Sequence, residues 1–310
     1  QHSRNQTLSV QTTPSSGYSN ATINAGELQS KGVELDLKLG VLTKDKNTVS
    51  LDLGANLGLY QSKVLSLQPG VNEFLLDGTS TSIFAVVGQP YPIIKGTDLL
   101  RDPQGRPIVS AVTGYPSIDP TQKAFGQTTP KYILGLTSSV GYKFVTLSAV
   151  AEYRAGNYIY NSIGSTLTFA GVSGLSASAG RQRFIFPNSV LQNADGSFTN
   201  NTDVAVRDGN YGFWQGNYYR ANSTYITSAA FWKLREVNLS FNLDQFINKT
   251  KFVKGLSFAL TGSNLLLFKP RENTWADPEF SLDNGNAVGQ TNSNQTPPTR
   301  VFGANLHVTF

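Results

Sequence analysis

The sequence predicts an all-β protein that crosses a membrane as part of an antiparallel β-barrel. Three observations predict this class. Apolar and polar residues alternate over segments of roughly 9 to 13 residues, which suits a tilted membrane crossing better than the shorter strands of soluble sandwiches. No comparable helical period is found, and the apolar runs are far too short for a membrane helix. Short and long connections also follow one another along the chain, as in outer-membrane barrels.

The first two alternating segments, 31–42 and 48–60, are predicted to form a hairpin. The first reads KGVELDLKLGVL, with apolar residues at every odd position from 33 to 41 and polar residues or glycine between them. The second reads TVSLDLGANLGLY and repeats the pattern without a slip. The short stretch TKDKN joins the two. Because side chains of a strand alternate between its faces, each strand has one apolar and one polar face.

Two later segments, 144–156 and 301–310, carry the same pattern. They read FVTLSAVAEYRAG and VFGANLHVTF, and only Val150 departs from the alternation, on the polar side of the first. In a closed membrane barrel the apolar face meets lipid and the polar face meets a wet lumen. We therefore expect the usual inside and outside of a globular protein to be exchanged.

The segment 232–243, WKLREVNLSFNL, contains a change of phase. Its apolar residues from Val237 onward lie on the opposite face from Trp232 and Leu234 if the strand is regular. Two explanations fit: a β-bulge near Arg235, or Lys233 and Arg235 pointing outward at the level of the lipid headgroups.

The connections divide into two classes by length. In outer-membrane barrels the short turns face the periplasm and the long loops face outward, and we expect the same here. The predicted short links lie near 43–47, 102–105, 142–143 and 244–252, and the predicted long loops span 11–27, 68–83, 114–130, 159–227 and 269–298.

Composition and motifs exclude several functions. Charged residues make up 15% of the chain, and the net charge of +5 is spread without a basic stripe, so nucleic acid is not an expected partner. There is no Cys, only two His, and no metalloprotease, nucleophile-elbow or phosphate-loop motif. The acidic residues Asp195, Asp203 and Asp208 lack the regular alternation of a calcium loop. We therefore predict no enzyme, no catalytic residue, no cofactor and no metal site, and we assign His307 no role.

Five motifs in order resemble the SusC/RagA family of TonB-dependent outer-membrane transporters of the Bacteroidetes. They are NAGELQSKGVELDL, VVGQPYPIIKG, TTPKYILGLTSSVGYKFVTLS, AAFWKLREVNLSFNL and GSNLLLFKPRENTWADPEFS. The last contains the family's Asp-Pro-Glu, and the terminal Phe310 resembles the aromatic residue by which such barrels are recognised for assembly. Two positions depart from the pattern: Lys233 stands where the family usually has Arg, and Trp275-Ala276 where it has Gly-Tyr.

The resemblance implies that residues 1–310 are the C-terminal part of such a barrel, about ten of roughly 22 strands. The chain contains no Met, so Gln1 is not a translation start and a processed or truncated piece is expected. The family's plug and TonB box have no counterpart here. Its mechanism implies four partners: a SusD-like surface lipoprotein, TonB-ExbB-ExbD acting through the missing N-terminal part, the remaining barrel and plug, and outer-membrane lipid.

Two groups of residues are candidates for contact with a substrate or partner. Polar residues predicted to face the lumen could guide a substrate, or could bond to each other, to plug residues or to water. These are Glu34, Asp36, Asp52, Asn56, Glu152, Arg154 and Glu236. An aromatic cluster in the longest loop could stack on a sugar, pack a peptide or dock a protein, or could form a membrane-interface girdle. It comprises Tyr211, Phe213, Trp214, Tyr218, Tyr219 and Arg220.

The function predicted first is TonB-dependent uptake of oligosaccharides or peptides across a Gram-negative, Bacteroidetes-like outer membrane. A self-contained small barrel acting as a porin or adhesin is an alternative from the same environment. A soluble β-sandwich that binds carbohydrate is an alternative from another class, and it would lack a hydrophobic outer belt.

Overall fold

The computed structural model describes residues 1–4, 7–11, 17, 20–24, 26–42, 49–78, 81–247, 252–282, 285, 287–296 and 298–310. The predicted link at 43–47 lies outside the described residues. No helix in the described part of the chain is long and apolar enough to cross a membrane.

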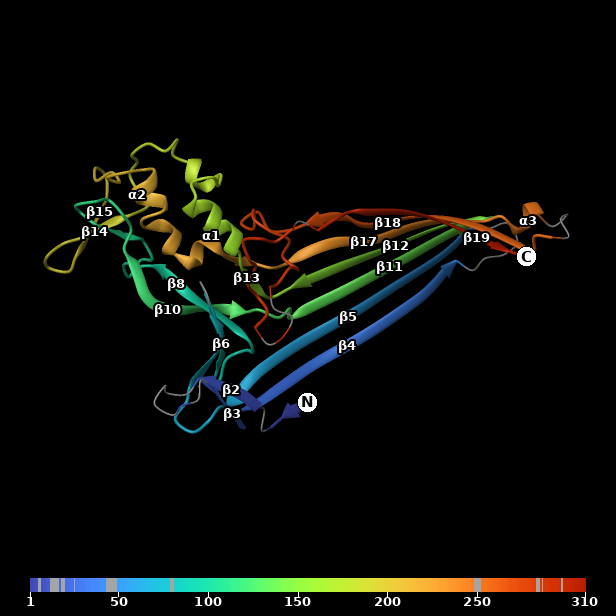
Figure 1. Cartoon of the computed structure of the whole chain (residues 1–310), viewed down its shortest axis with the longest axis horizontal. Helices are drawn as coiled ribbons and strands as arrows, with labels where there is room; N and C mark the ends of the chain where they lie inside the picture. Colours follow the sequence, from blue (N-terminus) through green and yellow to red (C-terminus); the bar gives the residue numbers. More distant parts are fainter. Residues whose placement is uncertain are drawn as a thin grey trace.

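The main sheet is antiparallel throughout, with the strand order β1-β4-β5-β11-β12-β17-β18-β19. Figure 1 shows it as a long curved sheet, with short connections at the end that carries the C-terminus and long connections gathered at the other. Its strands are β1 His2–Ser3, β4 Glu27–Leu42, β5 Val49–Ser66, β11 Tyr132–Tyr142, β12 Val145–Ala155, β17 Phe231–Asn242, β18 Gly255–Phe268 and β19 Val301–Thr309.

The register aligns the apolar positions of neighbouring strands on one face. Leu37 pairs with Ala55, which pairs with Leu136, which pairs with Ala151, so the pattern runs across four strands without a break. A shift of one residue would carry every side chain to the wrong face, so the alternation itself fixes this register. The predicted all-β class, with part of a membrane barrel, is confirmed.

The phase change in β17 is a β-bulge. Glu236 pairs with Val150 and Leu234 with Ala151, which leaves Arg235 as the extra residue opposite β12. The register toward β18 shifts at the same place. Because of the bulge, Leu234 and Val237 share the apolar face, and the second explanation, outward-pointing Lys233 and Arg235, is wrong.

The described part of the sheet has seven long strands, fewer than the roughly ten predicted. The difference lies in residues 67–131, where the short link predicted at 102–105 implies strands that cross the membrane. Instead β5 pairs directly with β11, and the whole segment between them stays at the loop end. The strand β8, Ile93–Leu99, is short and buried on both faces, so it lacks the exposed apolar face of a membrane strand.

The long connections fold into smaller sheets and short helices. The four-stranded sheet β10-β8-β7-β6 and the three-stranded sheet β15-β14-β9 lie at the loop end, together with the pair β13-β16, and β2 pairs with β3 near the N-terminus. Besides β8, the strands are β2 Thr7–Gln11, β3 Asn20–Asn24, β6 Glu73–Gly78, β7 Ser82–Val86, β9 Ile108–Val109, β10 Ile118–Gln127, β13 Tyr158–Tyr160, β14 Val190–Gln192, β15 Phe198–Asn200 and β16 Ile226–Ser228. The helices are α1 Ser162–Phe169, α2 Tyr211–Trp214 and α3 Asp244–Ile247, with 3-10 turns at Leu175–Ala177, Tyr218–Arg220 and Asn222–Tyr225.

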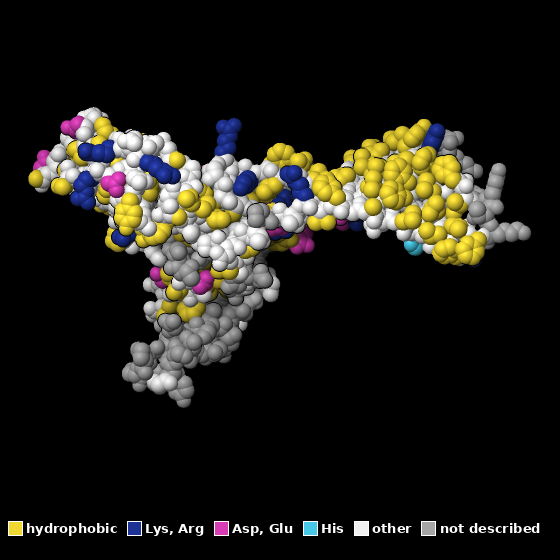
Figure 2. Space-filling view, turned by 45° about the horizontal axis from the view of Figure 1, so that its top comes forward, with side chains coloured by type: hydrophobic (Ala, Val, Ile, Leu, Met, Phe, Trp, Pro, Cys, Tyr) yellow, Lys and Arg dark blue, Asp and Glu magenta, His cyan; other side chains and the backbone are white. Residues whose placement is uncertain are grey.

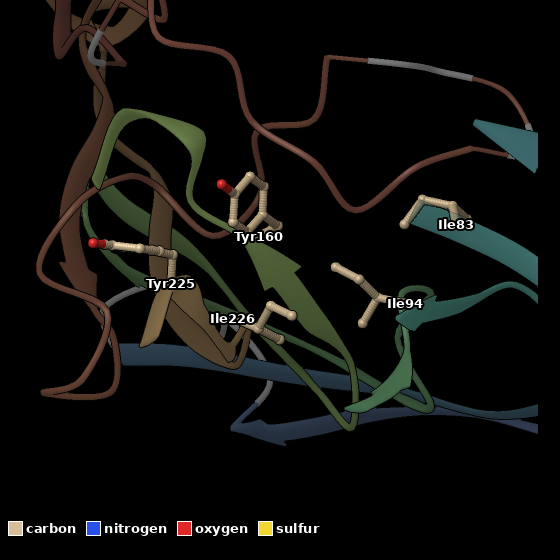
Figure 3. Packing of buried hydrophobic residues seen from close by; sticks show 5 residues of the cluster. All are labelled: Ile83, Ile94, Tyr160, Tyr225 and Ile226. Carbon is tan, nitrogen blue, oxygen red and sulfur yellow. The ribbon is translucent and has the colours of Figure 1, made fainter. Parts of the chain in front are cut away.

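A common hydrophobic core joins the three longest connections. Ile83 and Ile94 come from the connection 67–131, and Tyr160, Tyr225 and Ile226 come from 156–230; all five are buried (Figure 3). Trp275, from the connection after β18, packs against the same cluster. The long loops therefore form one folded body at one end of the sheet.

Candidate functional site

One face of the main sheet is apolar and exposed. Val33 is 64% exposed, Leu35 59% and Leu306 67%, fractions far above those of core residues. Figure 2 shows apolar side chains gathered over the part of the sheet remote from the long loops. An exposed apolar surface of this extent would be a liability in water and is the surface that lipid covers in a barrel.

Aromatic side chains border this face toward both strand ends. Toward the loops, Tyr153 stacks on Trp232 with ring centroids 4.9 Å apart, and Trp232 pairs with Phe268 in the next strand. At the short connections, Phe252 and Phe310 lie 5.1 Å apart. The roughly eight residues of β12 between the two borders span on the order of 20 Å along the membrane normal at the tilt of such strands. This arrangement matches the two aromatic girdles of outer-membrane barrels.

The predicted lumen-facing residues lie together on the opposite face. Asp36 pairs with Asn56, and across β11 the same row continues to Glu152 and Lys233. The neighbouring rows contain the other members of the set, Glu34, Asp52, Arg154 and Glu236. The structure thus brings all seven to one face, but it joins only Glu152 and Arg154 of them in one compact ionic network.

That network ties the connection 269–300 to the inner face of the sheet. Glu279 accepts hydrogen bonds from Arg235, at 2.7 Å from Nη1, and from Lys233. Arg154 Nη2 lies 3.5 Å from Glu279, and Glu152 bridges Arg154 and Arg235. Lys233 Nζ also lies 2.7 Å from Asp277 Oδ2. Three cations therefore meet three carboxylates, and the charges balance.

The electrostatics of the network favour ionised carboxylates. Burial opposes the ionisation of Glu279, but the hydrogen bonds and charges of Arg235 and Lys233 outweigh it and lower its pKa to about 2. Lys233 and Asp277 have side chains only 5% and 4% exposed, so each depends on the other for compensation. An ion-pair network of this kind holds a loop in one place; it offers no nucleophile or free base.

Four members of the network are not among the site residues that the sequence predicts: Lys233, Arg235, Asp277 and Glu279. A signal was present, because the phase change at Arg235 places two cations beside Glu236 on the polar face. The Asp-Pro-Glu stretch can be recognised in the sequence as a motif only, since nothing in its spacing shows which strand it contacts.

Two cavities lie where the inner face meets the loops, and Pro130 lines both. The first has a volume of about 300 Å³ and is lined by Arg154, Glu279, Asn157 and Phe231 among others. The second has a volume of about 620 Å³ and contains Glu34 and Tyr60 in its wall. Volumes of this size are in the range of small-molecule sites.

The aromatic cluster of the longest loop is largely a core. Phe213 and Trp214 are 0% and 5% exposed, and Phe213 stacks on Tyr218 at 5.3 Å. Tyr219 packs edge-on against Phe169. Tyr211, at 69%, and Arg220 remain exposed. Contact with a substrate or partner stays a prediction for this group, and only the exposed members have free surface for it.

The loop carboxylates serve local turns. Asp195 Oδ1 accepts hydrogen bonds from the backbone and hydroxyl of Ser197, and Asp208 accepts from the backbone N–H groups of Asn210 and Gly212. These bonds lower the pKa of both carboxyl groups. Among the described residues, no three His, Cys, Asp or Glu side chains are grouped so that they could hold a metal ion.

No family model matches the chain. It is 25% identical over 339 residues to TonB-dependent receptor P26 of Formosa agariphila, a match that covers 98% of this chain and 31% of that protein. It is 24% identical over 331 residues to TonB-dependent receptor P3 of the same organism, a match that covers 95% of this chain and 30% of that protein. The chain thus spans about a third of the length of the curated relatives it matches.

Solved structures show the same fold. The chain is similar to the RagAB peptide transporter, with a TM-score of 0.69 and 15% identity over 100% of this chain and 32% of that one. The RagAB peptide importer in its open-open state matches with a TM-score of 0.69 and 16% identity, and the match covers 100% of this chain and 32% of that one. In sequence the chain is therefore similar to TonB-dependent receptors and in fold to the RagAB transporter, which agrees with the resemblance of its motifs to the SusC/RagA family.

Proposed function

We propose that this chain forms part of the wall and the loop mouth of an outer-membrane importer that takes up oligosaccharides or peptides with energy from TonB. The observation that carries the proposal is the two-faced sheet. Its exposed face is apolar, and its other face holds the ionic network of Lys233, Arg235 and Glu279. A wall of this kind needs lipid on one side and a polar passage on the other.

The two edges of the sheet are evidence that these strands belong to a larger barrel. β4 and β19 are the outermost long strands, and β1 adds only two residues beside β4. Unpaired backbone groups along such edges would be costly in hydrocarbon. We assign the strands that pair with β4 and β19 to the remaining barrel, with its plug, rather than to a self-contained small barrel.

The folded loop body is evidence for a partner protein that covers the loops as a lid. The three long connections share the core around Ile83 and Tyr225 (Figure 3), so they form one folded body that can present a surface to a partner. We assign this surface to a SusD-like lipoprotein. TonB-ExbB-ExbD would act through the plug-bearing part and would not contact this chain. The function is transport, and no catalytic step is assigned.

Deletion of the gene in its native host tests the proposal. Growth is measured on defined neutral oligosaccharides and on defined peptides as the sole nutrient, in the deletion strain and in a strain lacking TonB. We expect both strains to lose growth on the same nutrient. If uptake persists in the strain lacking TonB but is lost in the strain lacking this protein, the protein is a passive porin instead.

A further inference from the structure

The larger of the two cavities contains an immobilised aromatic ring. Tyr60, in β5, is 40% exposed and lines the 620 Å³ cavity together with Ser30, Glu34, Gln127 and Thr129. It lies on the polar face of the sheet, since it pairs with Gly32 and the neighbouring inward position of β4 is Glu34.

Two glycines form a flat bed for this ring. A Cβ built on Gly58 would lie 2.5–2.8 Å from the ring and hydroxyl of Tyr60, and one built on Gly32 would lie 3.2 Å from Tyr60 Cδ1. The ring therefore lies against the backbone of both strands. Its hydroxyl donates a hydrogen bond to Glu34 Oε1 at 2.9 Å, which fixes the free end. One side of the ring is covered by the sheet, and the exposed remainder faces the cavity.

The rim of the cavity supplies hydrogen-bonding groups and one negative charge. Lys31 and Glu34 both border the cavity, but they are three residues apart in β4 and lie on opposite faces, so Glu34 is the charged side chain of the lining on the face of the ring. Gln127 holds its amide in place by donating from Nε2 to the carbonyl of Thr129 at 2.8 Å. A flat aromatic surface with amide, hydroxyl and carboxylate groups around it matches a neutral ligand that has an apolar face and many hydroxyl groups.

We propose that Tyr60 is a stacking platform for a pyranose unit of a neutral oligosaccharide. The proposal rests on the importer function given above and names its substrate class. An anionic ligand would require an excess of cations, and a peptide that binds by adding a strand could not enter between β4 and β5, which are paired with each other beside the ring. The neighbouring cavity, on the other side of Pro130, gives room for a second sugar unit.

The test measures binding to the full-length protein purified from the outer membrane. The probes are maltohexaose, cellohexaose and mannohexaose, with a pool of neutral octapeptides as the competing class. Tyr60→Leu removes the ring and should weaken binding of the preferred hexasaccharide about tenfold. Tyr60→Phe keeps the ring on its bed and should stay within about threefold of the parent. Tyr132→Leu is the matched control, because Tyr132 is also 40% exposed but lies on the apolar face.

A general loss of fold is separated from a loss of binding by comparing the unfolding temperatures of Tyr60→Leu and Tyr132→Leu. Equal hexasaccharide affinity in the parent and Tyr60→Leu would overturn the proposal, as would binding of octapeptides in place of all three sugars. Failure of every sugar to bind, while TonB-dependent growth on another nutrient persists, would overturn this inference and leave the importer function standing. Loss of TonB dependence itself would overturn both.

Discussion

Lys233 Nζ lies 2.7 Å from Asp277 Oδ2, and the two side chains are 5% and 4% exposed. This pair joins a strand of the main sheet to the connection 269–300. Breaking a buried pair by removing one partner leaves an uncompensated charge, which costs more than the pair contributes. The position of the loop therefore depends on Lys233.

The first prediction is that Lys233→Met destabilises the loop end by about 3–5 kcal/mol. The measurement is unfolding in denaturant combined with protease cleavage within 269–300. Lys38→Met is the control, since Lys38 and its partner Asp36 are 84% and 63% exposed, and such pairs contribute less than about 1 kcal/mol. If Lys233→Met and Lys38→Met have the same small effect, the ionic network does not hold the loop.

The second prediction concerns the stability of the connection 269–300 at acidic pH. The pKa of Glu279 is lowered from 4.5 to about 2, so its ionisation stabilises the folded loop at every pH above the unfolded value. We expect this contribution, at most about 3 kcal/mol, to disappear as the pH falls from about 4.5 to 2. Protease sensitivity of the loop should rise in that window. Glu279→Gln should show little of this pH dependence; an unchanged profile in the variant would mean that other groups control it.

The third prediction concerns the two faces of the sheet. An Arg at Leu53 or Leu239 should cost about 2–4 kcal/mol near the membrane midplane, because both side chains lie on the apolar face. The same change at Asn56 or Ser240, on the polar face, should cost much less. The yield of folded, heat-modifiable barrel measures the difference. Equal losses of folded barrel for Arg at the apolar-face and at the polar-face positions would contradict the assignment of the faces.

The strands could be predicted from the sequence because their information is local. Alternation of apolar and polar residues along β4 and β5 determines which face is apolar. The phase change at Arg235 predicts a local irregularity, and the structure shows that it is a bulge. The prediction for the segment 67–131 is wrong because short buried strands such as β8 alternate too briefly to be distinguished from membrane strands. Burial on both faces, which distinguishes them, depends on packing against distant residues such as Tyr225.

The ionic network could not be predicted for the same reason. Asp277 and Glu279 meet Lys233 and Arg235 only because the connection 269–300 folds back over the polar face. No spacing in the sequence encodes that return. The aromatic cluster around Phe213 was visible as a composition signal, but whether its rings lie inside or outside the loop body depends on neighbours such as Tyr115 and Phe184.

The fourth prediction concerns topology. The loop body and the short connections lie at opposite ends of the sheet (Figure 1), and we expect the loops to face outward and the short connections to face the periplasm. Asn210→Cys and Gln245→Cys introduce single thiols at exposed positions of a protein that has no cysteine. An impermeant maleimide should label whole cells at position 210 only. Labelling at position 245 but not at 210 would invert the topology.

The last prediction is that a SusD-like lipoprotein docks on the exposed side chains of the longest loop, Tyr211 and Arg220. Tyr211 is 69% exposed, Arg220 is exposed with its Cζ 5.7 Å from the centroid of the Tyr219 ring, and Tyr and Arg are enriched at protein contacts. Tyr211→Ala with Arg220→Ala should lower recovery of the lipoprotein with the purified transporter without changing its stability. Phe246→Ala is the matched control, because Phe246 is 63% exposed at the opposite end of the sheet.

Substitution of the buried rings would not test docking. Phe213→Ala removes a fully buried ring that contacts Tyr115, Phe184 and Tyr218, and should destabilise the loop body by about 3–5 kcal/mol. It would therefore lower lipoprotein recovery through unfolding, and the unfolding temperature would fall with it. The double variant of the exposed residues separates the two roles. If it retains full lipoprotein recovery and full uptake, the aromatic cluster serves only to fold the loop.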